Sequence, residues 1–144
     1  MLVVENIEVV YQTYVLVLKG LSLQVQSGAV TALLGTNGAG KSTTLKAISG
    51  LLEPEDGEVT RGRISFNGVD ITHMAPDRRV ASGIVQVMEG RRIFQDLSVE
   101  ENIRIGAYLE RDVRKTAARI ELVYNYFPRL AERRKQLAGY LSGG

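Results

Sequence analysis

The sequence predicts an α/β fold in which a strand-rich first part precedes a helical second part. Up to residue 97, short apolar runs alternate with polar residues or stop at glycine, as strands do. Beyond that point the apolar residues recur at helical spacing. The chain has 144 residues, 44% of them hydrophobic and 24% charged. This is enough for one domain with a buried core, and it excludes disorder, collagen and coiled coil.

Five strands are expected from the apolar runs, at 2–10, 21–25, 30–34, 64–66 and 84–87. The run at 21–25 alternates with period two, which is typical of a half-buried strand. The run at 30–34 is nearly continuous and is followed by glycine, which is typical of a strand buried on both faces of a sheet.

Helices are expected after the third of these strands and throughout the second part. A short helix starts at Ser42, with Leu45, Ile48 and Leu52 on one side and Gly50 near its end. In the second part, a capping box at Ser98 and Glu101 predicts a helix start. A longer helix is indicated by a stripe of residues at Val113, Ala117, Ile120, Val123 or Tyr124, and Phe127, ended by Pro128.

Residue counts exclude several kinds of site. The chain has no cysteine and one histidine, His73, so a disulfide framework and a Cys or His-cluster metal site are excluded. Its longest apolar stretches have about five residues, against about 20 for a membrane-spanning helix. The first residues lack the basic region of a signal peptide. We expect a soluble protein of the cytoplasm.

Charge is distributed unevenly along the chain. Residues 1–60 carry three basic and six acidic side chains, a net charge of −3, whereas residues 61–144 carry fifteen basic and ten acidic ones, a net charge of +5. A basic half is compatible with nucleic acid or an anionic membrane as a partner. Acidic residues are interspersed throughout it, which favours a solvated, arginine-rich helical part, and no nucleic acid partner is expected.

One glycine-rich segment predicts a phosphate site. Residues 35–42, GTNGAGKS, match the pattern G-x-x-x-x-G-K-[ST] at every fixed position. Glycines let the loop wrap tightly, so that backbone N–H groups converge on phosphate oxygens, and the following helix adds its positive dipole end. Lys41 is expected to reach the β- and γ-phosphates and the Ser42 hydroxyl to ligate Mg²⁺. The segment therefore predicts a P-loop that binds a nucleoside triphosphate.

The residues around this loop resemble the ATP-binding subunits of ABC transporters. The resemblance rests on residues 34–45, on the aromatic Tyr11 before them, and on the final LSGG at 141–144, which matches the start of the family's signature motif. It implies an α/β P-loop ATPase core with an antiparallel β part and an inserted helical subdomain, whose C-terminal part is missing here. The implied division is a core part at 1–94 and a helical subdomain at 95–144.

A second stretch is similar to the ATPases of branched-chain amino acid importers. It comprises GIVQVMEGRRIF at 83–94 and LSVEEN at 97–102, in which a Glu-Gly-Arg-Arg stretch replaces the usual Q-loop. Met88 stands where that subfamily usually has proline. The resemblance implies that ATP binding and hydrolysis are coupled to solute uptake across the membrane. Importers of urea or short-chain amides share the stretch, and a soluble ABC ATPase without a transport role is a further alternative.

The resemblance also implies an ATP and Mg²⁺ site around the P-loop. Tyr11 would stack on the adenine, with ordinary strand packing as the other interpretation. Gln12 replaces a usual glycine and the segment after it is one residue longer, so Tyr14 is a rival for that role. The implied nucleotide-binding residues are Tyr11, Gly35, Thr36, Asn37, Gly38, Ala39, Gly40, Lys41, Ser42 and Thr43.

Glu89 takes the place of the Q-loop glutamine in this resemblance. It would touch Mg²⁺ or the attacking water and report the nucleotide state to a permease. As a carboxylate it adds negative charge beside ATP unless a metal ion neutralises it. Gln86 is the glutamine nearby, but its position inside an apolar run predicts a strand residue.

The implied partners are integral-membrane permease subunits, a second ATP-binding subunit and, indirectly, a solute-binding protein outside the membrane. Arg91, Arg92 and Phe94 would form the surface that receives the permease's coupling helix; the alternative is a solvated arginine pair and a core phenylalanine. Three further residues, Ser142, Gly143 and Gly144, would bind the γ-phosphate held by the opposite subunit of a dimer. The subunit would lie on the cytoplasmic face of the membrane.

The catalytic residues of such an ATPase are not found in this sequence. The family needs a buried strand that ends in Asp-Glu, for Mg²⁺ and the attacking water, and a later switch histidine. No apolar run here ends in Asp-Glu, and His73 lies in a loop before Pro76. We therefore interpret the 144 residues as a fragment that is not expected to hydrolyse ATP alone and that exposes an apolar sheet edge.

Overall fold

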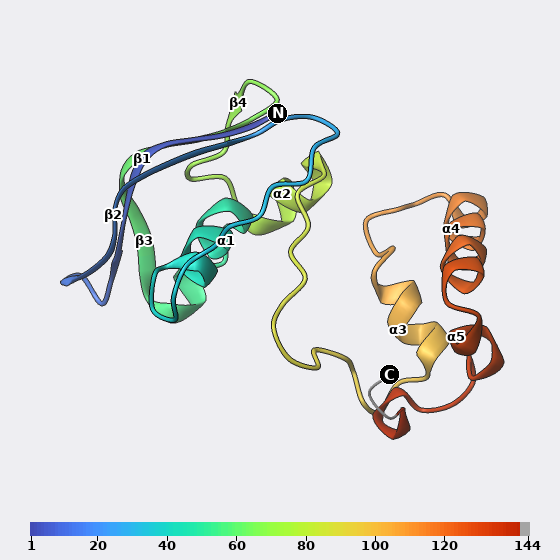
Figure 1. Cartoon of the computed structure of the whole chain (residues 1–144). Coiled ribbons are helices and arrows are strands. Elements are labelled where there is room, and N and C mark those ends of the chain that lie inside the picture. The colour runs from blue at the N-terminus through green and yellow to red at the C-terminus, as the bar shows by residue number, and fades with distance from the viewer. Residues whose placement is uncertain (142–144) are drawn as a thin grey trace. The chain divides into compact units, whose positions relative to one another are not determined.

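The computed structural model describes residues 1–141, and the chain forms two compact units, Met1–Val87 and Met88–Gly144. The first unit contains the strands β1 (Leu2–Tyr11), β2 (Val15–Val25), β3 (Gly57–Phe66) and β4 (Val69–Asp70), the helices α1 (Lys41–Ser49) and α2 (Pro76–Ser82), and the 3-10 turn η1 (Glu53–Glu55). The second contains α3 (Val99–Ile105), α4 (Val113–Tyr126), α5 (Pro128–Glu132) and η2 (Ala138–Tyr140) (Figure 1). The predicted α/β class is confirmed.

β1 lies at the centre of an antiparallel sheet with the strand order β2-β1-β3-β4. It bulges at Asn6, whose φ is 49°, and the pairing with both neighbours shifts there. Because of this bulge, Val4 and Ile7 are both buried on the core side, although residues three positions apart face opposite sides of a regular strand. Gly62 on β3 lies against the bulge, where a Cβ would come within 2.4 Å of the Asn6 carbonyl oxygen.

The core of the first unit forms where α1 packs against this sheet (Figure 1). Its buried residues are Val4, Ile7, Val9, Leu18, Ala47, Leu52, Ile64 and Ile71. α1 turns Thr44 and Ala47 inward, since positions three apart share a helix face, and both are 1% exposed. Leu45, expected on the apolar side, is 48% exposed, so that prediction was wrong.

Three expected strands are confirmed and two are not. The runs at 2–10, 21–25 and 64–66 lie within longer strands. The runs at 30–34 and 84–87 form no strand in the described part of the chain. A strand is stable when its backbone groups pair with a neighbour, and none of the four strands of the sheet pairs with either run.

Both unpaired runs leave apolar side chains in solvent. Val30 is fully exposed and Leu34 is 87% exposed in the first run, and Val87 is 92% exposed in the second. The expected burial of 30–34 on both faces was therefore wrong. The apolar pattern predicted extended chain, but burial depends on partners that the local pattern does not contain.

In the second unit, the predicted capping box is confirmed. The Glu101 carboxylate accepts the Ser98 backbone N–H at 2.7 Å, and the Ser98 hydroxyl accepts the Glu101 N–H at 3.2 Å. α4 has a cap of its own, in which the Asp112 carboxylate accepts the Arg114 N–H at 2.8 Å and the Lys115 N–H at 3.3 Å. Both helices therefore start where side-chain oxygens satisfy free N–H groups.

The apolar stripe expected along α4 is buried only in part. Ile120 and Tyr124 are each 7% exposed, whereas Val113 and Phe127 are 77% and 59% exposed. α4 has 14 residues, while α3 and α5, which it contacts, have seven and five. Helices this short cannot cover the whole length of α4, at about 1.5 Å of helix per residue. The ends of the stripe were therefore wrongly predicted as core.

All helices of both units are short. α4 is the longest in the described part of the chain, with 14 residues, and a membrane-spanning helix needs about 20. Within residues 1–141, the structure contains no helix that combines the length and the hydropathy needed to cross a membrane.

A candidate phosphate-binding site

The loop at 35–40 leads into α1 and has a tightly turned backbone. Gly38 and Gly40 have φ values of 82° and 85°, in the left-handed region that favours glycine. The Ala39 N–H donates to the Thr36 carbonyl oxygen at 3.2 Å, which closes a turn within the loop. At Gly40, a Cβ would also lie 2.5 Å from Cδ2 of Leu18 on β2. This glycine is therefore required both by its backbone angle and by its close approach to the sheet.

Lys41, the first residue of α1, folds its side chain back over the loop. Its Nζ donates to the carbonyl oxygens of Gly35 at 2.8 Å and Thr36 at 2.7 Å. A full positive charge therefore lies at the N-terminal end of α1, where the helix dipole adds partial positive charge. Hydrogen bonds from an ammonium to phosphate are about twice as strong as bonds between neutral groups, so a phosphate competes well with these carbonyls.

Thr44 anchors the first turn of α1. Its backbone N–H and its hydroxyl both donate to the Gly40 carbonyl oxygen, each at 2.8 Å, and the residue is buried. Ser42 and Thr43 lie in the same turn, Ser42 exposed and Thr43 half-buried. The residue expected to ligate Mg²⁺ is thus on the solvent side of the turn, next to Lys41 in the chain. This donor set of backbone N–H groups, lysine and hydroxyl fits a magnesium-bound polyphosphate.

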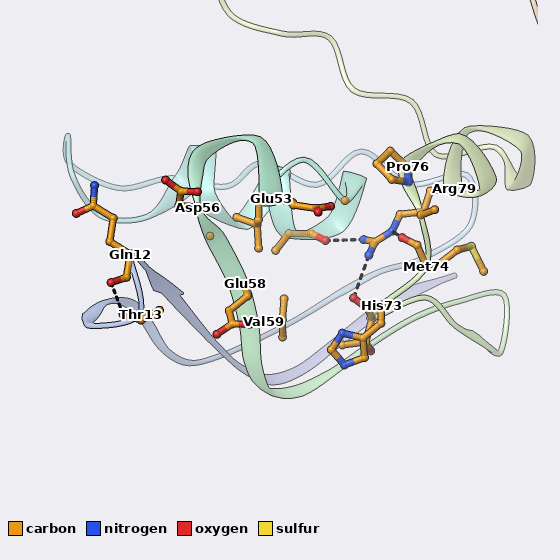
Figure 2. Close-up of a pocket in the computed structure, with 16 residues that line it drawn as sticks. Gln12, Thr13, Glu53, Asp56, Glu58, Val59, His73, Met74, Pro76 and Arg79 are labelled. Atoms are coloured by element: carbon orange, nitrogen blue, oxygen red, sulfur yellow. Dashed lines mark hydrogen bonds between the residues drawn. The ribbon is translucent and has the colours of Figure 1, made fainter.

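Arg79, on α2, is a functional candidate that the sequence did not indicate. It is 3% exposed. Its Nη1 donates to the carbonyl oxygens of Ala47 at 2.6 Å and Ile48 at 2.9 Å, at the C-terminal end of α1. Its Nε and Nη2 donate to Met74 at 2.7 Å and Thr72 at 3.0 Å (Figure 2). Burial lowers the pKa of the guanidinium, which still remains charged.

No spacing or motif distinguishes Arg79 from its neighbour Arg78, which is exposed. The sequence signals only that a short helix is present. Pro76 begins α2 and Gly83 follows its last residue, with φ 104°, so the two bracket a short helix. Which of its arginines turns inward is decided only by how α2 packs against α1.

Tyr11 and Tyr14, the two candidates for stacking on adenine, lie in different surroundings. Tyr11 ends β1, is half-buried, and has its ring against Gly57, where a Cβ would lie 2.7 Å from Cε1 of the ring. Tyr14 is 76% exposed, and its hydroxyl donates to Oε1 of Gln12 at 3.1 Å. Between them, Gln12 and Thr13 have positive φ values of 52° and 67° and form the turn from β1 to β2.

A cavity of about 800 Å³ in the first unit is separate from the phosphate loop (Figure 2). Its lining includes Gln12, Thr13, Glu53, Asp56, Glu58, His73, Met74 and Arg79, and no residue of 35–42. Three of these side chains are carboxylates, and carboxylates repel phosphate. The donors of Arg79 already bind backbone carbonyls. The lining of this cavity is therefore less suited to phosphate than the donors around the loop.

The residues expected to meet a permease lie in the second unit and are all exposed. The Arg91 guanidinium donates to the carbonyl oxygens of Ala138, at 2.8 Å, and Leu141. Arg92 is exposed, and its Nε donates to the Glu89 carbonyl oxygen at 3.3 Å. Glu89, Arg91 and Arg92 all lie at the surface, and Arg91 also fixes local structure through its two bonds.

Phe94 is 57% exposed, although its backbone is held firmly. The Asn102 side chain accepts the Phe94 N–H at 2.9 Å and donates to the Phe94 carbonyl oxygen at 2.9 Å. The same amide donates to the Leu97 and Ser98 carbonyl oxygens, at 3.3 and 2.9 Å. An aromatic side chain is thus presented to solvent on a braced loop. The residues expected to act in trans, at 142–144, lie outside the described residues.

Comparisons with known proteins find transport ATP-binding proteins among the relatives of this chain. A probable branched-chain amino acid transport ATP-binding protein of Archaeoglobus fulgidus, LivF, is 38% identical over 120 residues, which are 83% of this chain and 48% of that protein. A high-affinity branched-chain amino acid transport ATP-binding protein of Pseudomonas aeruginosa, BraG, is 35% identical over 127 residues, or 88% of this chain and 52% of that protein. The chain thus spans about half the length of these relatives.

A relative with another named solute also matches. A putative 2-aminoethylphosphonate import ATP-binding protein of Salmonella typhimurium, PhnT, is 37% identical over 105 residues, which are 73% of this chain and 26% of that protein. Relatives of this chain are therefore named for different solutes.

Solved structures agree on the fold. A nucleotide-free ATP-binding cassette from an ABC transporter superposes with a TM-score of 0.75 at 29% identity, over 99% of this chain and 59% of that one. The ADP conformation of an ATP-binding cassette of an ABC transporter gives the same values. Residues 18–144, most of the chain, match the ABC transporter family itself. The chain belongs to the ABC transporter family.

Proposed function

We propose that this chain is the nucleotide-binding part of the ATP-binding subunit of an ABC importer. The observation that carries the proposal is the loop at 35–40, with its left-handed glycines, leading into a helix whose first residue is Lys41. Family membership supports an ATP ligand, and one of the related cassettes is named for its ADP conformation.

Each residue of the cradle has a distinct part in binding. The N–H groups of the loop and of the first turn of α1 would donate to phosphate oxygens. Lys41 would exchange its bonds to the Gly35 and Thr36 carbonyls for bonds to the β- and γ-phosphates. The Ser42 hydroxyl would hold Mg²⁺, which neutralises part of the phosphate charge. Thr43 and Thr44 keep the turn in place, Thr44 through its two bonds to Gly40.

For the adenine, we propose Tyr11 as the stacking residue. It lies at the end of β1, while Leu18 of the paired strand β2 touches the P-loop glycine Gly40. The Tyr11 ring lies against Gly57, and this contact fixes the orientation of the ring. Tyr14, more exposed and bonded to Gln12, is the competing candidate. An aromatic face of either residue suits a purine.

In the second unit, we propose that Glu89 contacts the metal ion or the attacking water and that Arg92 and Phe94 meet the permease. Support comes from their exposure and from the braced backbone at Phe94. Arg91, also exposed, supports this surface through its bonds to the Ala138 and Leu141 carbonyls. A second ATP-binding subunit, a permease and Mg²⁺ complete the proposed assembly on the cytoplasmic face of the membrane.

As the solute we propose a branched-chain amino acid. Two relatives with this solute in their names match over more than four fifths of the chain. The phosphonate import protein is a competing indication, since it is nearly as similar over a shorter stretch. An importer of a phosphonate is therefore the second candidate function.

The 144 residues are expected to bind ATP with no useful turnover of their own. No apolar run in the sequence ends in Asp-Glu, and His73 lines the acidic cavity and not the phosphate loop. Hydrolysis needs a group that orients the attacking water. A single-turnover assay that shows hydrolysis by this chain at rates typical of the family would contradict the expectation.

The first test of the proposal is the affinity for Mg-ATP, measured by calorimetry on the chain and on Lys41→Ala. Losing a charge-assisted contact to phosphate costs about 1.5–3 kcal/mol, so we expect the affinity to fall by roughly ten- to a hundredfold. Lys19→Ala is the matched control, because Lys19 is an exposed lysine on β2 in the same unit.

The control separates local from general electrostatic effects. Lys19→Ala should bind Mg-ATP as the unaltered chain does. Equal loss in both variants would mean that net charge, and not the cradle, attracts ATP. Binding that survives Lys41→Ala unchanged would mean that the nucleotide does not sit in the loop.

A further inference from the structure

The last turn of α1 is tied to the chain that follows α2 by side-chain hydrogen bonds. Ser49, the last residue of α1, donates from its hydroxyl to Oε1 of Gln86 at 2.5 Å, and Ser49 is 7% exposed. In the same turn, the carbonyl oxygens of Ala47 and Ile48 accept from Arg79. α1 is therefore fixed at its C-terminal end by two polar side chains that are distant in sequence.

Arg79 and Gln86 belong to one continuous stretch. The Arg79 carbonyl oxygen accepts the backbone N–H of Ile84 at 3.0 Å, so the start of the segment 84–87 is bound to α2. Arg79 itself holds α1 through its guanidinium. The end of α1, α2 and the segment 84–87 are thus connected by three different interactions within the first unit.

Within 84–87 the side chains alternate between two environments. Ile84 packs partly against the core and Gln86 is half-buried, whereas Val85 and Val87 are 72% and 92% exposed. No neighbouring strand holds this segment in register. The hydrogen bond from Ser49 keeps Gln86, the third residue of this segment, turned toward α1.

We propose that Gln86 and Arg79 are positioning residues, which couple the P-loop helix to the segment that leads, two residues beyond 87, to Glu89. The inference rests on the proposed function, because it assigns a role within nucleotide binding. α1 spans nine residues, about 13 Å, and carries Lys41 at one end and Ser49 at the other. A change at the phosphate end of such a rigid element reaches the segment 84–87 through the two anchors.

The test uses amide hydrogen exchange of the whole chain with and without a non-hydrolysable ATP analogue and Mg²⁺. In the unaltered chain we expect the analogue to slow exchange at 41–49 and, by roughly fivefold, at 84–87 as well. In Gln86→Leu, which removes the acceptor, slowing at 41–49 should persist while slowing at 84–87 is lost. Gln86→Glu keeps an oxygen acceptor for the Ser49 hydroxyl and should restore it.

Two further variants control the comparison. Ser49→Ala removes the donor and should reproduce Gln86→Leu, without an added effect when both are combined. Val85→Ala changes an exposed side chain in the same segment and should leave the slowing at 84–87 intact. If Gln86 had a purely structural role, Gln86→Leu would raise exchange at 84–87 equally with and without the analogue. Gln86→Glu would then not restore a response of this segment to the analogue.

The outcomes distinguish the inference from the function on which it rests. If the analogue slows exchange at 41–49 but leaves 84–87 unaffected in the unaltered chain, the coupling is wrong and the cradle stands. Equal slowing at 84–87 in the chain and in Gln86→Leu also overturns the coupling. If neither segment responds to the analogue, the proposed function fails and the inference fails with it.

Discussion

Two residues at opposite ends of α1 decide how the phosphate loop is held. Gly40 permits the loop to pass within contact of Leu18 on β2, in a backbone conformation with φ 85°. Arg79 binds the carbonyl oxygens of Ala47 and Ile48, which the helix itself leaves without N–H partners. Gly40 allows the close approach because it has no side chain, and Arg79 holds the other end of the helix with a buried charge. Substitutions at the two positions should therefore destabilise the unit for different reasons.

Gly40→Ala should destabilise the first unit and weaken Mg-ATP binding together. A left-handed conformation costs an ordinary residue about 1–2 kcal/mol, and the new Cβ would also meet Leu18 at 2.5 Å, so we expect a loss of roughly 2–4 kcal/mol in unfolding free energy. Gly28→Ala is the control, because Gly28 has φ 73° and open space around it. Urea unfolding that gives equal losses for both would exclude the contact with Leu18 as the cause.

Arg79→Met should be strongly destabilising, although no acidic side chain among residues 1–141 forms an ion pair with the arginine. Four carbonyl oxygens, those of Ala47, Ile48, Thr72 and Met74, would lose their donor. Unsatisfied buried acceptors cost about 1–3 kcal/mol each before relaxation, so we expect a loss of at least about 3 kcal/mol by urea unfolding. Arg78→Met, at the exposed neighbour, should change stability by no more than about 0.5 kcal/mol; similar losses in both would contradict the role of Arg79.

At the scale of the elements, the local sequence determines where helices begin better than it determines how they pack. The capping box at Ser98 and the cap at Asp112 are short-range features, and the structure contains both. They set where α3 and α4 begin. The side of α4 that is buried depends instead on how far the shorter α3 and α5 reach along it, which no cap decides.

The capping box should give the second unit a pH dependence. Hydrogen bonds from the Ser98 side chain and backbone lower the pKa of the Glu101 carboxyl below its ordinary value of 4.5. Because the folded pKa is the lower one, this stabilisation is complete above about pH 4.5 and is lost as the pH falls through the folded pKa.

Two variants check this pH dependence. A carboxyl titration by NMR should show the Glu101 pKa below that of exposed glutamates, and Ser98→Ala should move it back toward 4.5. Glu101→Gln should remove this part of the acid sensitivity of α3. An unchanged Glu101 pKa in Ser98→Ala would show that the cap is not its cause.

At the scale of the whole molecule, each unit buries its own apolar residues, and a further set of apolar residues is exposed to solvent. The first unit has a core where α1 meets the sheet, and the runs at 30–34 and 84–87 lie outside it except for Ile84, which packs against it. Truncating the exposed side chains of these runs should therefore change the stability of the unit little, despite their apolar character.

Ile7→Ala and Val87→Ala should differ sharply in stability. Ile7 is fully buried beside the bulge of β1, and truncation of such a residue costs about 2–5 kcal/mol. Val87 is 92% exposed, so its truncation should cost no more than about 0.5 kcal/mol. Urea unfolding of both variants decides this. A loss of several kcal/mol for Val87→Ala would mean that 84–87 is paired in solution.

The phosphate loop and the packing around it differ in how far the sequence predicts them. The spacing of Gly35, Gly40 and Lys41 predicts a cradle, because backbone N–H groups and a helix N-terminus bind phosphate wherever that spacing occurs. The inward turn of Arg79 and the bond from Ser49 to Gln86 were not predicted. Each joins residues more than 30 positions apart, and no local pattern encodes such a contact.

The sequence by itself determined the elements whose causes are local: the strands 2–10, 21–25 and 64–66, the P-loop, and the capping box at Ser98. The tertiary structure alone decided which apolar residues are buried, because burial needs a partner surface. It left 30–34 and 84–87 without strand partners and turned Leu45 outward. It also placed a charged arginine inside, at the end of the helix that carries Lys41, since only the packing of α2 against α1 brings four carbonyl oxygens around one guanidinium.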